Sequence, residues 1–533
     1  MVAIGILLLV CILGVDAATL STVTLDYGTF KGVTNTTTGL ISFLGVRYAD
    51  PPTGALRWRA PVSPPSKHLG KVDATALGSA CIGTTQTNSG ATTDEDCLFS
   101  NVYVPINATL GSNLPVLVFF HGGGFENGRT RDAPAQFFMP HIKQPMLFVT
   151  FEYRLGQFGF LAGTPVHQSG QLNVGLLDQR AALEWVQIYI AQFGGDPTKV
   201  TIWGQSAGAA SVVYHLIAEG GEDKGLFRQA IADSPPMLSL FRYNDPHIEN
   251  LFMQYAGFAG CSGSGNGPAI MACLRAASTK TIATAGSKLL ANLTSALFPI
   301  GPIFDGSFLR ERPVEAFQNG HFVRVPGIFG SNTNEGDHWS AELDNPLANT
   351  SMPNATQTTV YNFLAGQYLD LSRSSFDTAV AQFYPLTDYN GSFSLQGQQM
   401  YGEMRYICSA LSVGGALNVS GVPSWQFHWD NPTLGSSHGD ELDAFFEDDS
   451  GNDNANEAVV VAMREFWNSF AVSGSPLSPS ASVLWTASYP QENGVDGGPR
   501  ILFHPSQVAM EPVDPKLAAR CAFWHSLSTE LAI

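Results

Sequence analysis

Short apolar runs alternate with segments of helical periodicity through the middle of the chain. Continuous apolar runs, as expected of strands buried on both faces, occur at 115–120 and 146–151, and further strands are predicted at 200–203, 325–329 and 425–429. Apolar residues at helical spacing predict helices over 177–193, 207–217 and 458–470. This order of strands and helices predicts an α/β fold with a large, mostly parallel central sheet, helices on both faces and long insertions.

The first residues form an apolar stretch that is followed by small side chains. About 12 apolar residues run to Val15, fewer than the ~20 that a membrane-spanning helix needs. Ala17 and Ala18 come next, a pattern typical of a secretory signal peptide cleaved after one of them. We therefore expect residues 1–17 to be a signal peptide and the mature chain to be secreted and extracellular, the alternative being a buried N-terminal strand or helix. No Pro-, Gly- or Ser-rich linker divides the remainder, so residues 18–533 are predicted to form one domain.

Cysteines and glycosylation sequons agree with an extracellular location. Short loops favour the pairs Cys81–Cys97 and Cys261–Cys273, which leaves Cys408–Cys521, although the cysteine spacing alone leaves other pairings open. Free buried thiols are not expected in a secreted chain, and no CxxC pair indicates a metal site. Candidate N-glycosylation sites are Asn35, Asn107, Asn292, Asn349, Asn354, Asn390 and Asn418.

Composition excludes several classes of function. The chain has 533 residues, 44% hydrophobic and 14% charged, which is typical of a globular protein. Its net charge of −18 repels phosphate backbones and anionic lipid headgroups, so nucleic-acid binding is not expected. Beyond the first residues no apolar run reaches 18 residues, so stable membrane insertion is not expected either. The sequence indicates neither a cofactor nor a metal, and it carries no signal for an oligomeric state.

The most specific local signal is the Gly-Gln-Ser-Ala-Gly of 204–208, between a predicted strand and a predicted helix. In that context G-x-S-x-G describes a nucleophile elbow, a strained turn that exposes the Ser206 hydroxyl at the top of a sheet. The alternative is an ordinary serine in a glycine-flanked turn. A serine needs a base within hydrogen-bond reach to become a nucleophile, so a histidine partner is expected.

A family resemblance follows from this motif. The segment 193–208, FGGDPTKVTIWGQSAG, resembles the serine signature of the type-B carboxylesterase/lipase family, which includes cholinesterases and fungal lipases. The segment 95–105, EDCLFSNVYVP, is similar to that family's second signature except for the polar Ser100. Two further segments are similar to the family: LGVRYADPPTGALRWRAP at 44–61 and RCAFW at 520–524. The resemblance therefore spans nearly the whole mature chain. It implies an α/β-hydrolase catalytic domain and hydrolysis of carboxylic esters.

The resemblance also implies the residues of an oxyanion hole. HGGGF at 121–125 follows the strand 115–120, and its glycines free backbone N–H groups to turn toward a substrate. We assign the donors to Gly123, Gly124 and Ala207 by the family pattern. No GK[ST] follows, so a phosphate-binding loop is excluded, and His121 is expected to be structural.

Two loops supply the predicted base and acid. His438 lies in a small-residue loop after the strand 425–429 and matches the family's base, whereas His428 lies inside that strand. Glu335, in an Asn-Glu-Gly setting, matches the family's acid, and Asp337 is the alternative. The order Ser206, Glu335, His438 is that of α/β-hydrolases. Ser234 resembles a serine that lies near the triad in this family.

The choice of ester is the least specific prediction. The 15-residue loop between Cys81 and Cys97 contains no aromatic residue for a choline ammonium and no apolar stripe for an interfacial lid. A pocket wall of Leu297, Phe298 and Ile300 suits medium-chain acyl or aryl esters. The alternatives are a lipase or sterol esterase for long-chain lipid esters, a feruloyl-type esterase, a peptidase, and a non-catalytic cholinesterase-like binding module.

Overall fold

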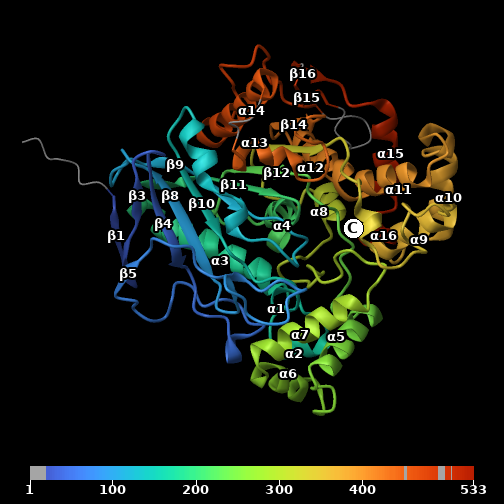
Figure 1. Ribbon diagram of the computed structural model, residues 1–533, viewed down its shortest axis with the longest axis horizontal. Helices are drawn as coiled ribbons and strands as arrows, with labels where there is room; N and C mark the ends of the chain where they lie inside the picture. The colour runs from blue at the N-terminus through green and yellow to red at the C-terminus, as the bar shows by residue number, and fades with distance from the viewer. Residues whose placement is uncertain (1–19, 449–452, 490–497, 506) are drawn as a thin grey trace, which may run out of the picture.

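The computed structural model describes residues 20–448, 453–489, 498–505 and 507–533 (Figure 1). The predicted signal peptide lies outside the described residues. The predicted domain is described except for its first two residues and three short gaps. No helix within these ranges is both long and apolar enough to cross a bilayer.

A large sheet forms the centre of the described structure. Its 11 strands have the order β16-β15-β14-β13-β12-β11-β9-β10-β8-β4-β3. Neighbouring strands from β15 to β10 run parallel, and the outer strands pair antiparallel. The predicted α/β architecture is confirmed. The strands are β3 (Val33–Asn35), β4 (Leu40–Arg47), β8 (Phe99–Pro105), β9 (Leu114–Phe120), β10 (Leu147–Phe151), β11 (Gly195–Gln205), β12 (Gln229–Asp233), β13 (Gly327–Asn332), β14 (Ser424–Trp429), β15 (Arg500–His504) and β16 (Gln507–Glu511).

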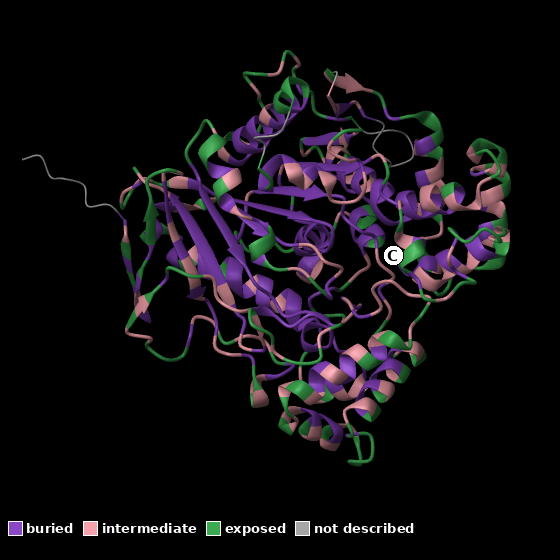
Figure 2. Cartoon of the chain, viewed as in Figure 1, coloured by how far each residue is buried: buried purple, intermediate pink, exposed green. Residues whose placement is uncertain are grey.

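Alternate residues of the central strands face two separate cores, which explains the continuous apolar runs. In β9, Val116 and Val118 belong to one core together with α3 (Val174–Tyr189) and α4 (Ala207–Gly221). Leu117 and Phe119 belong to the other, with α13 (Asp443–Phe446) and α14 (Asn454–Ser473). Figure 2 shows the central strands as buried throughout. Both faces of the sheet are therefore covered, as parallel sheets require.

Two helical lobes extend from the sheet (Figure 1). The lower lobe contains α2 (Thr164–Ser169), α5 (Pro246–Phe258), α6 (Gly267–Ala276) and α7 (Thr279–Ala291). The lobe at the right has its own apolar core and contains α9 (Gln357–Gln367), α10 (Arg373–Gln382), α11 (Phe393–Gly402), α15 (Pro515–Ser526) and α16 (Ser528–Leu531). Helix α12 (Cys408–Val419) follows α11 and packs against β13 and β14 of the sheet. The remaining α-helices and strands are α1 (Gly156–Gly159), α8 (Pro313–Asn319), the small sheet of β1 (Thr22–Leu25), β2 (Gly28–Lys31) and β5 (Lys71–Asp73), and the pair β6 (Ala80–Cys81) and β7 (Thr93–Asp94).

Three disulfides lie in the described structure, and they are the two pairs favoured by short loops and the pair that these leave. Cys81–Cys97 closes the loop that contains β7. Cys261–Cys273 joins the end of α5 to α6, and Cys408–Cys521 joins α12 to α15. Each bond therefore restrains an insertion.

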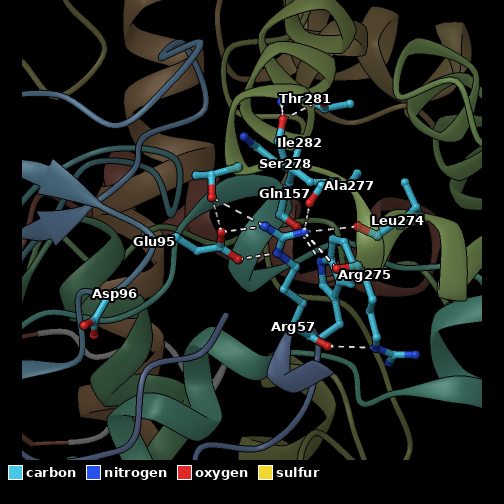
Figure 3. Close-up of polar contacts among 12 residues, drawn as sticks. Arg57, Glu95, Asp96, Gln157, Leu274, Arg275, Ala277, Ser278, Thr281 and Ile282 are labelled. Atoms are coloured by element: carbon cyan, nitrogen blue, oxygen red, sulfur yellow. Dashed lines mark hydrogen bonds and ion pairs between the residues drawn. The ribbon is translucent and has the colours of Figure 1, made fainter. Parts of the chain in front are cut away.

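A buried ion pair attaches the lower lobe to the sheet region (Figure 3). The Arg57 guanidinium donates two hydrogen bonds to the Glu95 carboxylate, one of them 2.7 Å long, and both side chains are buried. Its third nitrogen donates to the carbonyl oxygens of Leu274, Arg275 and Ala277, at 3.2, 3.2 and 2.5 Å. These carbonyls end α6, where a cation is favourable because the helix leaves its last acceptors unpaired.

Breaking this ion pair should destabilise the fold much more than breaking an exposed one. Arg57→Met leaves the Glu95 charge buried without its partner, so we expect the free energy of unfolding to fall by about 3–5 kcal/mol. Arg373→Met removes an exposed partner of Asp377 and should cost less than about 1 kcal/mol. Urea unfolding of both variants tests this, and equal losses would contradict a special role for Arg57.

Candidate active site

Neighbouring parallel strands bring four polar side chains to one edge of the sheet. Strands β11, β12, β13 and β14 are adjacent in the sheet. Ser206 follows β11 directly and Ser234 follows β12, while Glu335 and His438 lie in the loops after β13 and β14. Carboxyl ends of parallel strands meet at the same edge, where sites of open α/β sheets assemble.

Ser206 occupies a strained turn between β11 and α4. Its φ of 55° and ψ of −125° lie outside the regions that a serine ordinarily adopts. A Cβ on Gly204 would lie 2.3 Å from the carbonyl carbon of Gly208, and one on Gly208 would lie 1.9 Å from the carbonyl oxygen of Phe120. Both flanking positions therefore require glycine. This is the geometry of a nucleophile elbow.

His438 bridges the serine and a buried carboxylate. Its Nε2 lies 2.8 Å from Ser206 Oγ, and its Nδ1 lies 2.6 Å from Glu335 Oε2. With the Nδ1 proton donated to the carboxylate, Nε2 is left to accept the serine proton. Glu335 is fully buried, whereas Ser206 keeps 9% of its surface exposed.

Glu335 is held by further hydrogen bonds, and the alternative residues lie elsewhere. Its Oε1 accepts from the Ser234 hydroxyl at 2.5 Å and from the Asn332 N–H at 2.7 Å. Asp337 instead accepts from the Ser437 hydroxyl at 3.2 Å. His428 contacts the Glu511 carboxylate at 2.8 Å and the Thr333 hydroxyl at 2.9 Å. The structure thus brings together Ser206, Glu335 and His438 and leaves out Asp337 and His428.

Two more carboxyl groups lie buried near this acid. Burial raises the pKa of Asp233, and burial together with the Asp233 and Glu335 charges raises the pKa of Glu441, both well above their usual ranges. Asn332 donates its side-chain amide to Glu441 and its backbone N–H to Glu335. Burial therefore favours the neutral forms of Asp233 and Glu441, which limits the negative charge beside Glu335.

Aromatic rings enclose the imidazole. The Tyr406 ring lies 4.1 Å from that of His438, centroid to centroid, and the Trp339 ring packs edge-on at 5.6 Å. The Trp339 indole N–H donates to the Glu335 carbonyl oxygen at 2.8 Å. Packing and hydrogen bonding together fix the orientation of the base.

The glycine loop after β9 lies against the nucleophile. A Cβ on Gly122 would lie 3.1 Å from Ser206 Cβ, and Gly123 and Gly124 have φ of 106° and 64°. In the part of the chain that the structure describes, the amides of Gly123, Gly124 and Ala207 donate to no protein group. All three are thus available to a substrate oxygen.

Buried titratable side chains lie next to the glycine loop and support it. His121 stacks on Tyr153 with ring centroids 4.3 Å apart, its Nδ1 lies 2.9 Å from the Gly122 carbonyl oxygen, and burial lowers its pKa to about 4. Burial raises the pKa of Glu152 to about 7, although the carboxylate accepts two bonds from Thr130. The neutral His121 is therefore placed to support the loop, and it does not contact the triad.

Glu126 connects the glycine loop to the expected pocket wall. Its Oε1 accepts from the Ile300 N–H at 2.8 Å, and burial raises the pKa of the carboxyl to about 8. Phe298, two residues before Ile300, is so close that a Cβ on Gly124 would lie 2.1 Å from its ring. Leu297 is only partly buried and donates its N–H to Gln367 at 3.0 Å. Of the three expected wall residues, Phe298 is the one against the loop.

Sequence reasoning missed Glu126, Tyr406 and Trp339. None of them belongs to a motif that signals catalysis by itself. Glu126 directly follows the HGGGF segment, so its position was the one available signal. The contacts of Tyr406 and Trp339 to His438 join residues far apart in the sequence, and only the fold reveals them.

Taken together, these groups can perform acyl transfer. An alcohol, an imidazole and a carboxylate are connected by hydrogen bonds beside three unpaired amides. A cavity of about 590 Å³ is lined by Gly122, Gly123 and Gln205 and by residues of the Cys81–Cys97 loop. Among the described residues, no cluster of three His, Cys, Asp or Glu side chains could hold a metal ion.

Comparisons with known proteins agree with this chemistry. The carboxylesterase family model matches residues 19–496. A secreted lipase of Botryotinia fuckeliana is 30% identical over 84% of this chain and 83% of its own length. A secreted triacylglycerol lipase of Gibberella zeae is 31% identical over 75% of this chain and 74% of its own. The crystal structure of Aspergillus niger EstA superposes with a TM-score of 0.83 at 31% identity, covering 96% of this chain and 99% of that one.

Replacing Glu126 should change how stability depends on pH. The folded protein keeps the Glu126 proton up to about pH 8, whereas an unfolded chain loses it near 4.5, so the wild type loses about 1.4 kcal/mol per pH unit between these values. Glu126→Gln keeps the acceptor for Ile300 but does not titrate. Its unfolding free energy should therefore rise relative to wild type from pH 5 to pH 7.5 in urea unfolding. Parallel curves would contradict the burial of a proton there, and the exposed Glu457→Gln serves as a surface control.

Proposed function

The chain belongs to the carboxylesterase family and is a carboxylic ester hydrolase, and on this premise we propose that it is a secreted serine esterase acting on medium-chain acyl or aryl esters through an acyl-enzyme. The observation that carries the proposal is the continuous contact of Ser206 Oγ, the His438 ring and the Glu335 carboxylate, 2.8 and 2.6 Å long.

The reaction proceeds in two acyl transfers. His438 Nε2 accepts the Ser206 proton while Oγ attacks the ester carbonyl carbon. The tetrahedral intermediate collapses, the alcohol leaves with the proton from His438, and the acyl group stays on Ser206. Water then repeats the attack with His438 again as base, which releases the acid and regenerates the serine.

Stabilisation of the oxyanion comes from backbone amides. Gly123, Gly124 and Ala207 would donate to the carbonyl oxygen as it becomes negative, and each such donor contributes about 2.7–4 kcal/mol to the transition state. Glu335 holds the imidazole in the tautomer that accepts at Nε2 and stabilises the imidazolium without itself being protonated.

Secretion has separate support. The predicted signal peptide of 1–17 precedes the domain, and the two relatives named above are described as secreted. Three disulfides fit an oxidising compartment. The candidate glycosylation sites are at least partly accessible; those with exposed side chains are Asn35, Asn107, Asn292, Asn354 and Asn390.

The short, polar loop between Cys81 and Cys97 favours an esterase over an interfacial lipase. The relatives named as lipases are the reason to keep a lipase or sterol esterase as the second candidate, with a feruloyl-type esterase as a third. A binding module without activity is disfavoured because all three triad positions are filled and in contact.

A panel of esters tests the proposal. We expect kcat/KM for p-nitrophenyl esters to peak at medium acyl chains, with lower rates on triacylglycerol emulsions and sterol esters. Methyl ferulate tests the aryl class, and p-nitroanilides test for peptidase activity. Ser206→Ala is the control and should remove turnover of every substrate. A peak at long chains with emulsion dependence would favour a lipase, and activity that survives Ser206→Ala would contradict the mechanism.

A further inference from the structure

A cavity beside the catalytic centre has a buried arginine in its wall. The cavity measures about 330 Å³, and its wall is mostly apolar: Leu238, Phe241, Leu293, Phe298 and Ile303 line it together with Arg405. Phe298 also packs against Gly124 of the glycine loop and against the Trp339 ring, at 5.6 Å between centroids. The cavity and the catalytic centre therefore share one aromatic side chain.

Arg405 comes from the same turn that supports the base. It lies in a π-helical segment, Glu403–Ile407, between α11 and α12. The next residue, Tyr406, stacks on His438. Single turns of π-helix are rare and are found frequently at functional sites. One irregular turn thus supplies both the ring over the imidazole and a guanidinium to the cavity.

The Arg405 charge has no carboxylate partner within the described parts of the chain. Its Nε is buried without an acceptor, and the side chain is 94% buried, since only 6% of the residue is exposed. Glu403, two residues earlier, is already paired through both oxygens with Arg520, at 2.7 Å each. The hydroxyls of Tyr368, Tyr401 and Tyr406 are its electrostatic neighbours. A buried charge without a counterion is costly, and a bound anion would remove that cost.

We propose that this cavity receives the distal end of the acyl group and that Arg405 selects acyl chains that end in a carboxylate. Monoesters of medium-chain dicarboxylic acids would then be preferred substrates. The inference rests on the proposed ester hydrolysis and changes none of its steps: water adds to the acyl carbon, the alcohol leaves with a proton, and a dicarboxylate is released. The chain of methylene groups would cover the apolar wall while its terminal carboxylate meets the planar guanidinium, which matches a carboxylate through two parallel bonds.

Because the chain is strongly negative overall, a preference for acyl chains with a terminal carboxylate must come from groups inside the cavity. A net charge of −18 repels anions at a distance, so surface electrostatics cannot favour an acidic substrate. Only a positive group inside the cavity can reverse that preference. The preference for an acidic substrate therefore depends on short-range contact with Arg405, and replacing this residue should reduce that preference.

The test compares two esters with the same six-carbon acyl length. Mono-p-nitrophenyl adipate carries the terminal carboxylate, and p-nitrophenyl hexanoate does not. We expect the ratio of kcat/KM, adipate ester over hexanoate ester, to fall about 10- to 100-fold in Arg405→Met, the range expected for loss of a hydrogen bond to a charged group. Arg405→Lys keeps the charge without the planar fork and should restore part of the ratio. Arg373→Met, the same change on an exposed helix, should keep the wild-type ratio.

Failure of this inference is distinguishable from failure of the proposed function. Equal losses on both esters, or no change in the ratio, would assign Arg405 a structural role and overturn the inference, while turnover of hexanoate would still support ester hydrolysis. If the variants do not fold, wild-type inhibition decides: adipate should compete against hexanoate ester hydrolysis more strongly than hexanoate does. Equal or weaker inhibition by adipate would overturn the inference.

Discussion

The parallel pairing of β11, β12, β13 and β14 is the constraint on which the catalytic site depends. Their registers bring Ser206, Ser234, Glu335 and His438 to one edge, although 232 residues separate the serine from the histidine. Moving one strand by a single residue would displace its loop by roughly 3.3 Å, more than a hydrogen bond allows. The two apolar cores that hold the sheet therefore also hold the distances of the triad.

Burial of polar groups gives the site its rigidity. Ser206 has a strained backbone, and the groups around it have little freedom because Glu335 accepts from Ser234, Asn332 and His438. Asp233 and Glu441 are buried nearby, and burial raises their pKa values, which favours their neutral forms. On the other side, Glu126 connects the glycine loop to the segment that carries Phe298. Strain at the nucleophile persists because the surrounding contacts over-determine its position.

Local sequence patterns predicted several central strands and the two glycine-rich turns of the site. Continuous apolar runs predicted β9 and β10, short strand-like segments predicted parts of β11, β13 and β14, and the glycine motifs predicted the nucleophile elbow and the loop beside it. Strand β12 has the sequence QAIAD, with a single large apolar residue, and the edge strand β16 mixes polar and apolar residues, so neither produced a clear signal. Arg57 and Tyr406 act through Glu95 and His438, which lie more than 30 residues away in the sequence, and no local pattern specifies such contacts.

The central claim is that Ser206, His438 and Glu335 act as one unit. The most direct measurement compares kcat on p-nitrophenyl butyrate for three variants. Two carry the single changes Ser206→Ala and His438→Ala, and the third combines both of these with Glu335→Ala. If the three side chains act together, either single change should lower kcat by about 10⁴-fold or more, and removing all three should cost little beyond that. Losses that multiply with each substitution would show independent contributions and would contradict the account.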